Sequence, residues 1–474
     1  MPFRSQWRDL SQLHSDGIPL DAVSNETAKL FDAALSQYIG WYNEPQLNGL
    51  ENTFEKLFES DPNCVLSQVF SVGVELLSTS VPYRNSSSSK LAHLNQTFEK
   101  KLSETNDKNY LTLHVKAINE WAQGSLSHAA NTWEQLLLYY PHDILAIKMA
   151  HDTYFFNGNK EMIRDSIARL IPIWESKSTP LPLSSYLYGM HAFGLGENNM
   201  LDEAQQQARK GLELNENDAW ATHAIAHSYE YRGNTCSGIE FMSSTEHDWS
   251  KCEWLSKHNY WHWALYQFEQ GDYEIASNIL FKKILGNNNS ELMMLDFVDI
   301  GSLFYRLKLC GVDCENKLLE NKSVDKFIKH HLDDHLLVFN DLHLYFLLQN
   351  SSDEKTKFLK SLKETIGDNG FDNNENRRIY ETVGKHMFQA LDYFELDQHD
   401  RVVECLYPIR QQIMNIGGSN AQRDVFTLLL IHSAVHSPEK QHRLLAQRLL
   451  NERSQLRGNT SNLMKHYTDK LIGD

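Results

Sequence analysis

A repeated spacing of an apolar residue, an aromatic residue and proline constrains the fold of this chain more than any other feature of its sequence. Ala129 is followed by Trp133 four positions later and by Pro141 eight positions after that, and residues 50–62 keep the same spacing. A four-residue interval places the first two side chains on one face of a helix, and proline is best tolerated where a helix ends. The pattern predicts short helices that pack on their neighbours through this face.

The rest of the sequence also predicts helices, because amphipathic stretches such as DEAQQQARKGLEL alternate with short polar turns and no alternating strand pattern occurs. The spacing around Trp133 is that of the second helix of a tetratricopeptide repeat, and DAWATHAIAHSYEYRG and HNYWHWAL match the first-helix frame. An insertion around SSTEHDWSKC lengthens the connection between these two segments. We therefore predict an all-α fold, a tetratricopeptide-like right-handed superhelix of degenerate helix pairs.

Three regions are expected along this superhelix. Residues 1–105 form an N-terminal helical region with a degenerate repeat, and residues 106–285 hold the central tetratricopeptide-like repeats. Residues 286–474 form C-terminal helical repeats and a cap.

Charge and cysteine content narrow the class of protein. The formal net charge is −17, whereas nucleic acids and anionic membranes are bound through clustered Lys and Arg. The first residues lack the apolar core of a signal peptide, and no apolar run is long enough to span a membrane. The six cysteines are scattered, so they do not form a disulfide framework. We predict a cytoplasmic protein that binds neither nucleic acid nor membranes.

Two histidine pairs are the strongest candidates for a site. His223 with His227, and His258 with His262, have the i, i+4 spacing that places both imidazoles on one face of a helix. The repeat register directs these residues, together with aromatic and charged neighbours, into the concave groove of the superhelix. The predicted groove residues are Lys148, Asp152, Tyr186, Phe193, Trp220, His223, His227, Glu230, His258, Trp261 and His262.

The histidine pairs have three competing interpretations: packing or hydrogen bonding in a crowded groove, recognition of a ligand, and metal binding or catalysis. Four imidazoles are suitable ligands for Zn, Cu or Ni, and Glu230 is placed to supply a carboxylate. HAIAH is not a metalloprotease motif, because Ala224 stands where the general base is required.

The segment GGSNA has a structural interpretation and a weaker catalytic one. Gly417 and Gly418 fit a helix C-cap, and Ser419 or Asn420 fits the next N-cap. A nucleophile elbow requires a preceding strand and nearby acid and base partners, which the sequence does not supply.

The segments AHDTYFFNG, DAWATHAIAHSYEYRG, HNYWHWAL and YPIRQQIMNIGGSNAQRDVF resemble the tetratricopeptide repeat protein 38 family. The resemblance covers most of the chain and is weakest in the first hundred residues and around 350–377. It implies a soluble all-α repeat protein and does not imply a particular reaction.

The leading functional prediction is an interaction scaffold whose groove binds a peptide or a small ligand, with no metal and no cofactor assigned. The alternative is an enzyme of small molecules, in which His227 or His262 is the general base or the four histidines hold a metal. The sequence leaves open whether the two histidine helices converge.

Overall fold

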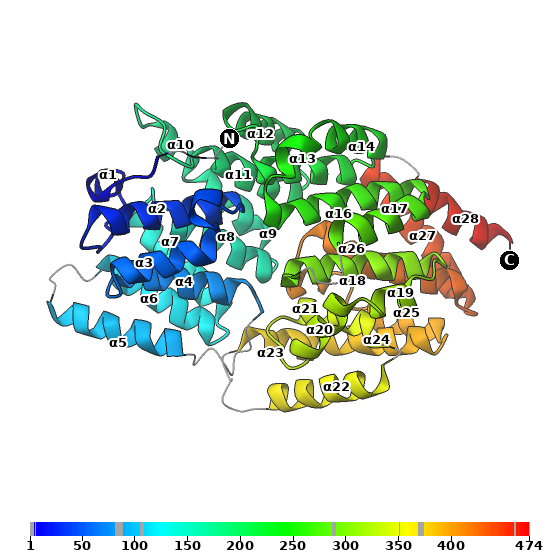
Figure 1. The fold of residues 1–474 in the computed structure, drawn as a ribbon. Helices are drawn as coiled ribbons and strands as arrows, with labels where there is room; N and C mark the ends of the chain where they lie inside the picture. The colour runs from blue at the N-terminus through cyan, green and yellow to red at the C-terminus, as the bar shows by residue number, and fades with distance from the viewer. Residues whose placement is uncertain are drawn as a thin grey trace. The chain divides into compact units, whose positions relative to one another are not determined.

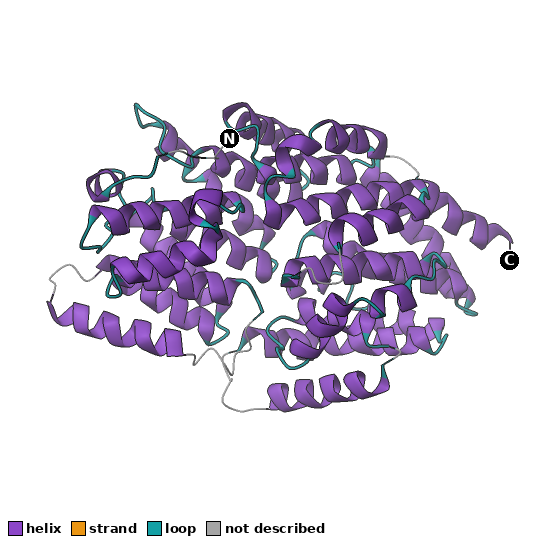
Figure 2. Cartoon of the chain, in the orientation of Figure 1, coloured by secondary structure: helices purple, strands orange, loops and turns teal. Residues whose placement is uncertain are grey.

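The computed structural model describes residues 4, 6–80, 89–104, 109–286, 291–349, 351–367, 374–458 and 461–473. Every regular element in these residues is a helix, and Figure 2 shows helices joined by loops. The predicted all-α fold class is confirmed within these residues. The arrangement of the helices as a tetratricopeptide-like superhelix stays a prediction.

The chain divides into two compact units, Met1–Ile225 with His247–Ser256, and Ala226–Glu246 with Lys257–Asp474. The three regions expected along the repeat remain a prediction, because the two units are defined by contacts in space and not by repeat boundaries. Figure 1 labels the helices of both units.

The helices of the first unit are α1 (Leu10–Ser15), α2 (Asn25–Gly40), α3 (Gly49–Ser60), α4 (Val65–Leu77), α5 (Ser89–Glu104), α6 (Asn109–Ala122), α7 (Leu126–Tyr139), α8 (Ile144–Phe156), α9 (Lys160–Ala168), α10 (Ile171–Glu175), α11 (Ser185–Glu197), α12 (Leu201–Leu214) and α15 (Glu246–Trp249). Two helices, α13 (Ala219–Tyr231) and α16 (Glu253–Gln270), begin in this unit and end in the second, and α15 begins at Glu246 of the second unit. Helices that are consecutive in sequence pack as neighbours from α6 to α9, as expected for a helical repeat.

The remaining helices belong to the second unit: α14 (Thr235–Ser244), α17 (Tyr273–Ile279), α18 (Met294–Leu309), α19 (Glu315–Leu319), α20 (Lys322–His330), α21 (Val338–Leu347), α22 (Ser352–Gly367), α23 (Glu375–Ile379), α24 (Lys385–Glu395), α25 (His399–Leu406), α26 (Asn420–His436), α27 (Lys440–Arg457) and α28 (Asn462–Gly473). Helix α26 packs against both α18 and α27. Within the described residues, no helix combines the length and apolar character needed to cross a lipid bilayer.

The repeat signature forms the core predicted for it. Ala129 and Trp133 on α7 are fully buried, and Pro141 follows the end of that helix. The insertion between the two histidine-bearing helices contributes the end of α14 and the whole of α15, whose Trp249 is buried.

The GGSNA segment is a helix junction, as its cap interpretation predicts. Gly417 and Gly418 both have positive φ, and Ser419 caps α26 in a capping box with Gln422.

Close helix crossings depend on glycine at two points of α11. A Cβ atom on Gly194 would lie 2.5 Å from the Cα atom of Arg164 on α9, and one on Gly189 would lie 2.9 Å from the backbone nitrogen of Ala221 on α13. These crossings bring α9 and α13 against α11 more closely than any side chain would permit.

The variant Gly194→Ala is expected to destabilise the protein by about 1–3 kcal/mol, because the added methyl group forces α9 and α11 apart. Gly196→Ala is the matched control on the same helix: nothing lies within 4 Å of its Cβ position, so this change should leave stability unchanged or raise it by up to about 1 kcal/mol. Thermal unfolding followed by circular dichroism measures both. Equal melting temperatures for the two variants would contradict the close crossing.

Candidate functional site

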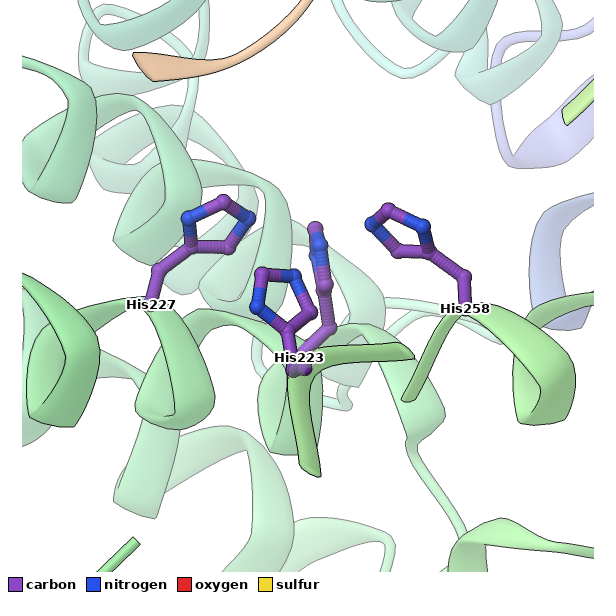
Figure 3. Close-up of side chains that lie close together, drawn as sticks. His223, His227 and His258 are labelled. Carbon is purple, nitrogen blue, oxygen red and sulfur yellow. The ribbon is translucent and has the colours of Figure 1, made fainter. Parts of the chain in front are cut away.

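The two histidine pairs lie together on α13 and α16. One ligand atom from each of His223, His227, His258 and His262 lies within 4.8 Å of those of the others, and all four residues are buried. Figure 3 shows the rings of His223, His227 and His258 directed toward one another. The two pairs, whose convergence their spacing alone left open, therefore form one cluster, which we call the histidine cluster.

Helix geometry positions this cluster. Because α13 and α16 are continuous, each presents its two imidazoles one turn apart on the same face. The hydroxyl of Tyr266 on α16 donates to the backbone carbonyl of Ala226 on α13 at 2.6 Å, which fixes the two helices beside each other next to the cluster.

The Nδ1 atoms of His227, His258 and His262 each have a hydrogen-bond partner. The Nδ1 atom of His258 lies 2.7 Å from a carboxylate oxygen of Asp299, and that of His262 lies 3.0 Å from one of Glu230. The Nδ1 atom of His227 lies 2.8 Å from the hydroxyl of Tyr231. An ionised carboxylate only accepts hydrogen bonds, so when Asp299 and Glu230 are ionised, His258 and His262 carry their protons on Nδ1 and have the lone pair on Nε2.

Burial controls the charge of the histidine cluster. It lowers the pKa of His227 and His262 well below the usual range, and the neighbouring His258 lowers both pKa values further. These imidazoles are therefore neutral near pH 7, which is the form that binds metals. Burial also raises the pKa of Glu230 to about 7, against the opposing effect of Arg457, and raises that of Asp299 against the opposing effect of His258.

An aromatic ring and a buried arginine cover one side of the histidine cluster. Trp261, fully buried, stacks on His258 with ring centroids 5.2 Å apart and planes inclined by 14°. The guanidinium of Arg306 lies 5.5 Å from the centroid of the Trp261 ring and donates to the carbonyl of Ala421 at 2.7 Å. These contacts restrict the rotation of His258 and keep water from that side.

Glu230 belongs to a larger charged network. Arg457 on α27 lies 3.9 Å from the Glu230 carboxylate and donates to the Glu230 backbone carbonyl at 3.4 Å. It also contacts Asp424 at 3.3 Å and Glu269 at 3.2 Å, and Arg453 pairs with the same two carboxylates. The C-terminal helices therefore reach the outer partners of the histidine cluster.

Three predicted groove residues of the first unit, Lys148, Asp152 and Trp220, form a second cluster, whose Trp220 ring lies 6.1 Å from that of His223. Lys148 pairs with Asp152 at 2.5 Å, and its ammonium lies 4.5 Å from the Trp220 ring centroid. The rings of Tyr38 and Trp41 lie 5.5 Å and 5.3 Å from the same ammonium, and the Tyr38 hydroxyl donates to Asp152 at 3.3 Å. The protein's own lysine therefore fills this aromatic cage.

Two further groove residues of this unit, Phe193 and Tyr186, are placed differently. Phe193 lies against His223, with ring centroids 5.3 Å apart. Tyr186 packs on α2, because a methyl group on Gly40 would lie 2.6 Å from its hydroxyl. Recognition of a peptide or small ligand by the predicted residues remains a prediction. Each of the four histidines is 0–4% exposed, so the histidine cluster is enclosed.

The sequence predicted the four imidazoles and one of their outer partners, Glu230, but not Asp299 or Tyr231. Tyr231 was recognisable, because it lies four residues after His227 on the same helix. Asp299 and Arg457 carry no local signal, since they lie 41 residues from His258 and 227 residues from Glu230.

No protein-family model matches the chain. A solved structure described as the human IFIT1 dimer with m7Gppp-AAAA is similar to this chain at 12% sequence identity and a TM-score of 0.36. The alignment covers 85% of this chain and 90% of the IFIT1 chain. A likeness at that level transfers neither details of the fold nor a function. The resemblance to the tetratricopeptide repeat protein 38 family therefore stays a prediction.

Replacing Lys148 by Met is expected to lower stability by about 3 kcal/mol, because it leaves the Asp152 carboxylate without its counter-charge in a partly buried position. Lys116→Met is the matched control: Lys116 also pairs with a carboxylate four residues away, but its side chain is 51% exposed against 1% for Lys148. The control should change stability by less than about 0.5 kcal/mol. Urea unfolding compares them, and a Lys148→Met protein as stable as the control would argue for a ligand-binding lysine instead.

Proposed function

We propose that this protein is a metalloprotein in which His223, His227, His258 and His262 bind one divalent transition-metal ion. The observation that supports the proposal is the convergence of four buried imidazoles whose ligand atoms all lie within 4.8 Å. A tetrahedral Zn site with Zn–N bonds of about 2.0–2.1 Å has nitrogen atoms about 3.4 Å apart. Because the ligand atoms lie within 4.8 Å of one another, any two of them need to approach by about 1.4 Å at most to reach that spacing.

The outer partners support the same proposal. Histidines that bind metals usually donate their second ring N–H to a carboxylate, a carbonyl or water, which fixes the tautomer and the ring orientation. Asp299 and Glu230 provide this arrangement for His258 and His262, and Tyr231 contacts His227 in the same way.

The donor set favours particular ions. Imidazole nitrogen binds Zn, Cu, Ni, Co and Fe, whereas Mg and Ca prefer oxygen ligands. Four protein ligands complete a tetrahedral site, so Zn in this coordination would be structural. An ion that takes five or six ligands keeps positions for a small molecule, and its chemistry there would be that of a Lewis acid. The identity of the ion therefore separates a structural role from the enzyme alternative.

Recognition of a peptide in an open groove is the leading prediction from sequence, and it would require these buried residues to become exposed. Each of the four histidines is at most 4% exposed, so a peptide would reach them only after the cluster opened. A metal ion requires no such opening beyond its own entry.

The purified protein is expected to contain about one transition-metal ion per chain, measured by inductively coupled plasma mass spectrometry. The double variant His227→Ala, His258→Ala should lose this metal because it removes one ligand from each helix. His128→Ala, His247→Ala is the control, since both residues are exposed, and it should keep the metal. Circular dichroism establishes that both variants are folded.

A second measurement tests metal uptake directly, because a bound ion can be lost during purification. The metal-free protein is dialysed against Zn²⁺, Co²⁺, Ni²⁺, Cu²⁺, Fe²⁺ and Mn²⁺ in turn, and the absorption spectrum of the Co²⁺ form reports the coordination number. Wild-type protein that takes up none of these ions, or equal uptake by the histidine double variant, would contradict the proposal.

A further inference from the structure

A buried network of two arginines and three carboxylates connects the C-terminal helix α27 to the histidine cluster. Arg453 and Arg457 lie one turn apart on α27, with side chains 6% and 11% exposed. Their partners are Glu230 on α13, Glu269 on α16 and Asp424 on α26. The four helices α13, α16, α26 and α27 therefore meet at these five side chains.

Arg457 is the member of this network that contacts Glu230. Its guanidinium approaches both the carboxylate and the backbone carbonyl of Glu230, at 3.9 Å and 3.4 Å. The other carboxylate oxygen of Glu230 lies 3.0 Å from Nδ1 of His262. The chain of contacts therefore runs from α27 through one carboxylate to one imidazole of the cluster.

Arg453 and the two remaining carboxylates hold Arg457 in place. Arg453 donates to Glu269 at 2.5 Å and to Asp424 at 2.7 Å, and Arg457 shares both of these acceptors. A planar guanidinium held by two carboxylates keeps one orientation, so its remaining N–H groups point to a fixed place.

We propose that Arg457 is a positioning residue for the metal centre, an inference that rests on the proposed function. It holds the Glu230 carboxylate against Nδ1–H of His262, so that Nε2 of His262 faces the metal in the correct tautomer. The C-terminal helix thereby sets metal affinity without supplying a ligand.

A second contact from the same region supports this role for the C-terminal helices. The backbone N–H of Ala421 on α26 donates to the hydroxyl of Tyr231 at 3.3 Å, and that hydroxyl is the partner of His227. The outer partners of two imidazoles, one on each histidine helix, are thus held from α26 and α27.

A double-mutant cycle tests the inference with Arg457→Met, Glu230→Gln and the combined variant of the full-length protein. Apparent Kd values for Zn²⁺ come from competition with a chromophoric chelator. Removing an outer partner typically weakens metal binding by about 10–100-fold, so each single variant should raise Kd by at least about tenfold. Because Arg457 acts through Glu230, the combined variant should be no weaker than Glu230→Gln alone.

Arg448→Met is the matched control, since Arg448 lies on α27 and is exposed, and it should bind Zn²⁺ like the wild type. Arg457→Lys keeps the charge without the forked donor and should fall between wild type and Arg457→Met. Circular dichroism of the metal-free proteins shows whether each variant is folded, and if Arg457→Met is not, Arg457→Lys takes its place in the cycle.

Each outcome bears on one of the two proposals. Wild-type affinity in Arg457→Met, or effects of Arg457→Met and Glu230→Gln that multiply in the combined variant, would overturn the positioning role while the metal centre stands. A wild-type protein that binds no Zn²⁺ or other ion would instead overturn the metal centre itself.

Discussion

Placing four imidazoles together inside a protein is the constraint on which the site depends. A buried polar group must be hydrogen-bonded or neutral, because leaving it without compensation costs about 1–3 kcal/mol. His258 and His262 meet this requirement on their outer side through carboxylates, and His227 meets it through Tyr231. On the inner side, one ring nitrogen of each of the four histidines lies within 4.8 Å of those of the others, and a cation is a partner that all four can share. The outer hydrogen bonds, the lowered pKa values and the metal proposal follow from this single requirement.

The repeat architecture supplies the precision that such a cluster needs. Small residues at helix crossings let the backbones approach, as Gly194 does against Arg164 and as Gly238 does beneath the ring of Tyr266. Tyr266 in turn bonds to Ala226 on α13, only one residue from His227. A methyl group added at one of these crossings would push a helix away by some tenths of an ångström or more, and metal–ligand distances are held to within about 0.2 Å.

Periodicity in the sequence was sufficient to predict the helices, the capping of α26 by Ser419 and the two histidine pairs, because each of these depends on residues close together in the chain. The same reasoning placed Lys148 and Trp220 in a ligand groove. They do lie together, but Lys148 itself occupies the aromatic cage. A repeat register predicts which face of a helix a residue is on, and it does not predict what covers that face. Asp299 and Arg457 were beyond prediction for a related reason, since only tertiary packing brings them to α16 and α13.

The charges around the histidine cluster favour a cation for a reason independent of coordination geometry. Asp299, Glu230, Glu269 and Asp424 face the three guanidinium groups of Arg306, Arg453 and Arg457, which leaves one negative charge in excess when all seven are ionised. Burial opposes that excess: it raises the pKa of Glu230, the carboxylate beside His262, to about 7, and it also raises the pKa of Asp299. A divalent ion held by His262 would favour the ionised form of Glu230, and an ionised Glu230 would strengthen His262 as a ligand. Metal binding and the charge of Glu230 are therefore coupled, and Arg457, which contacts that carboxylate, acts on both.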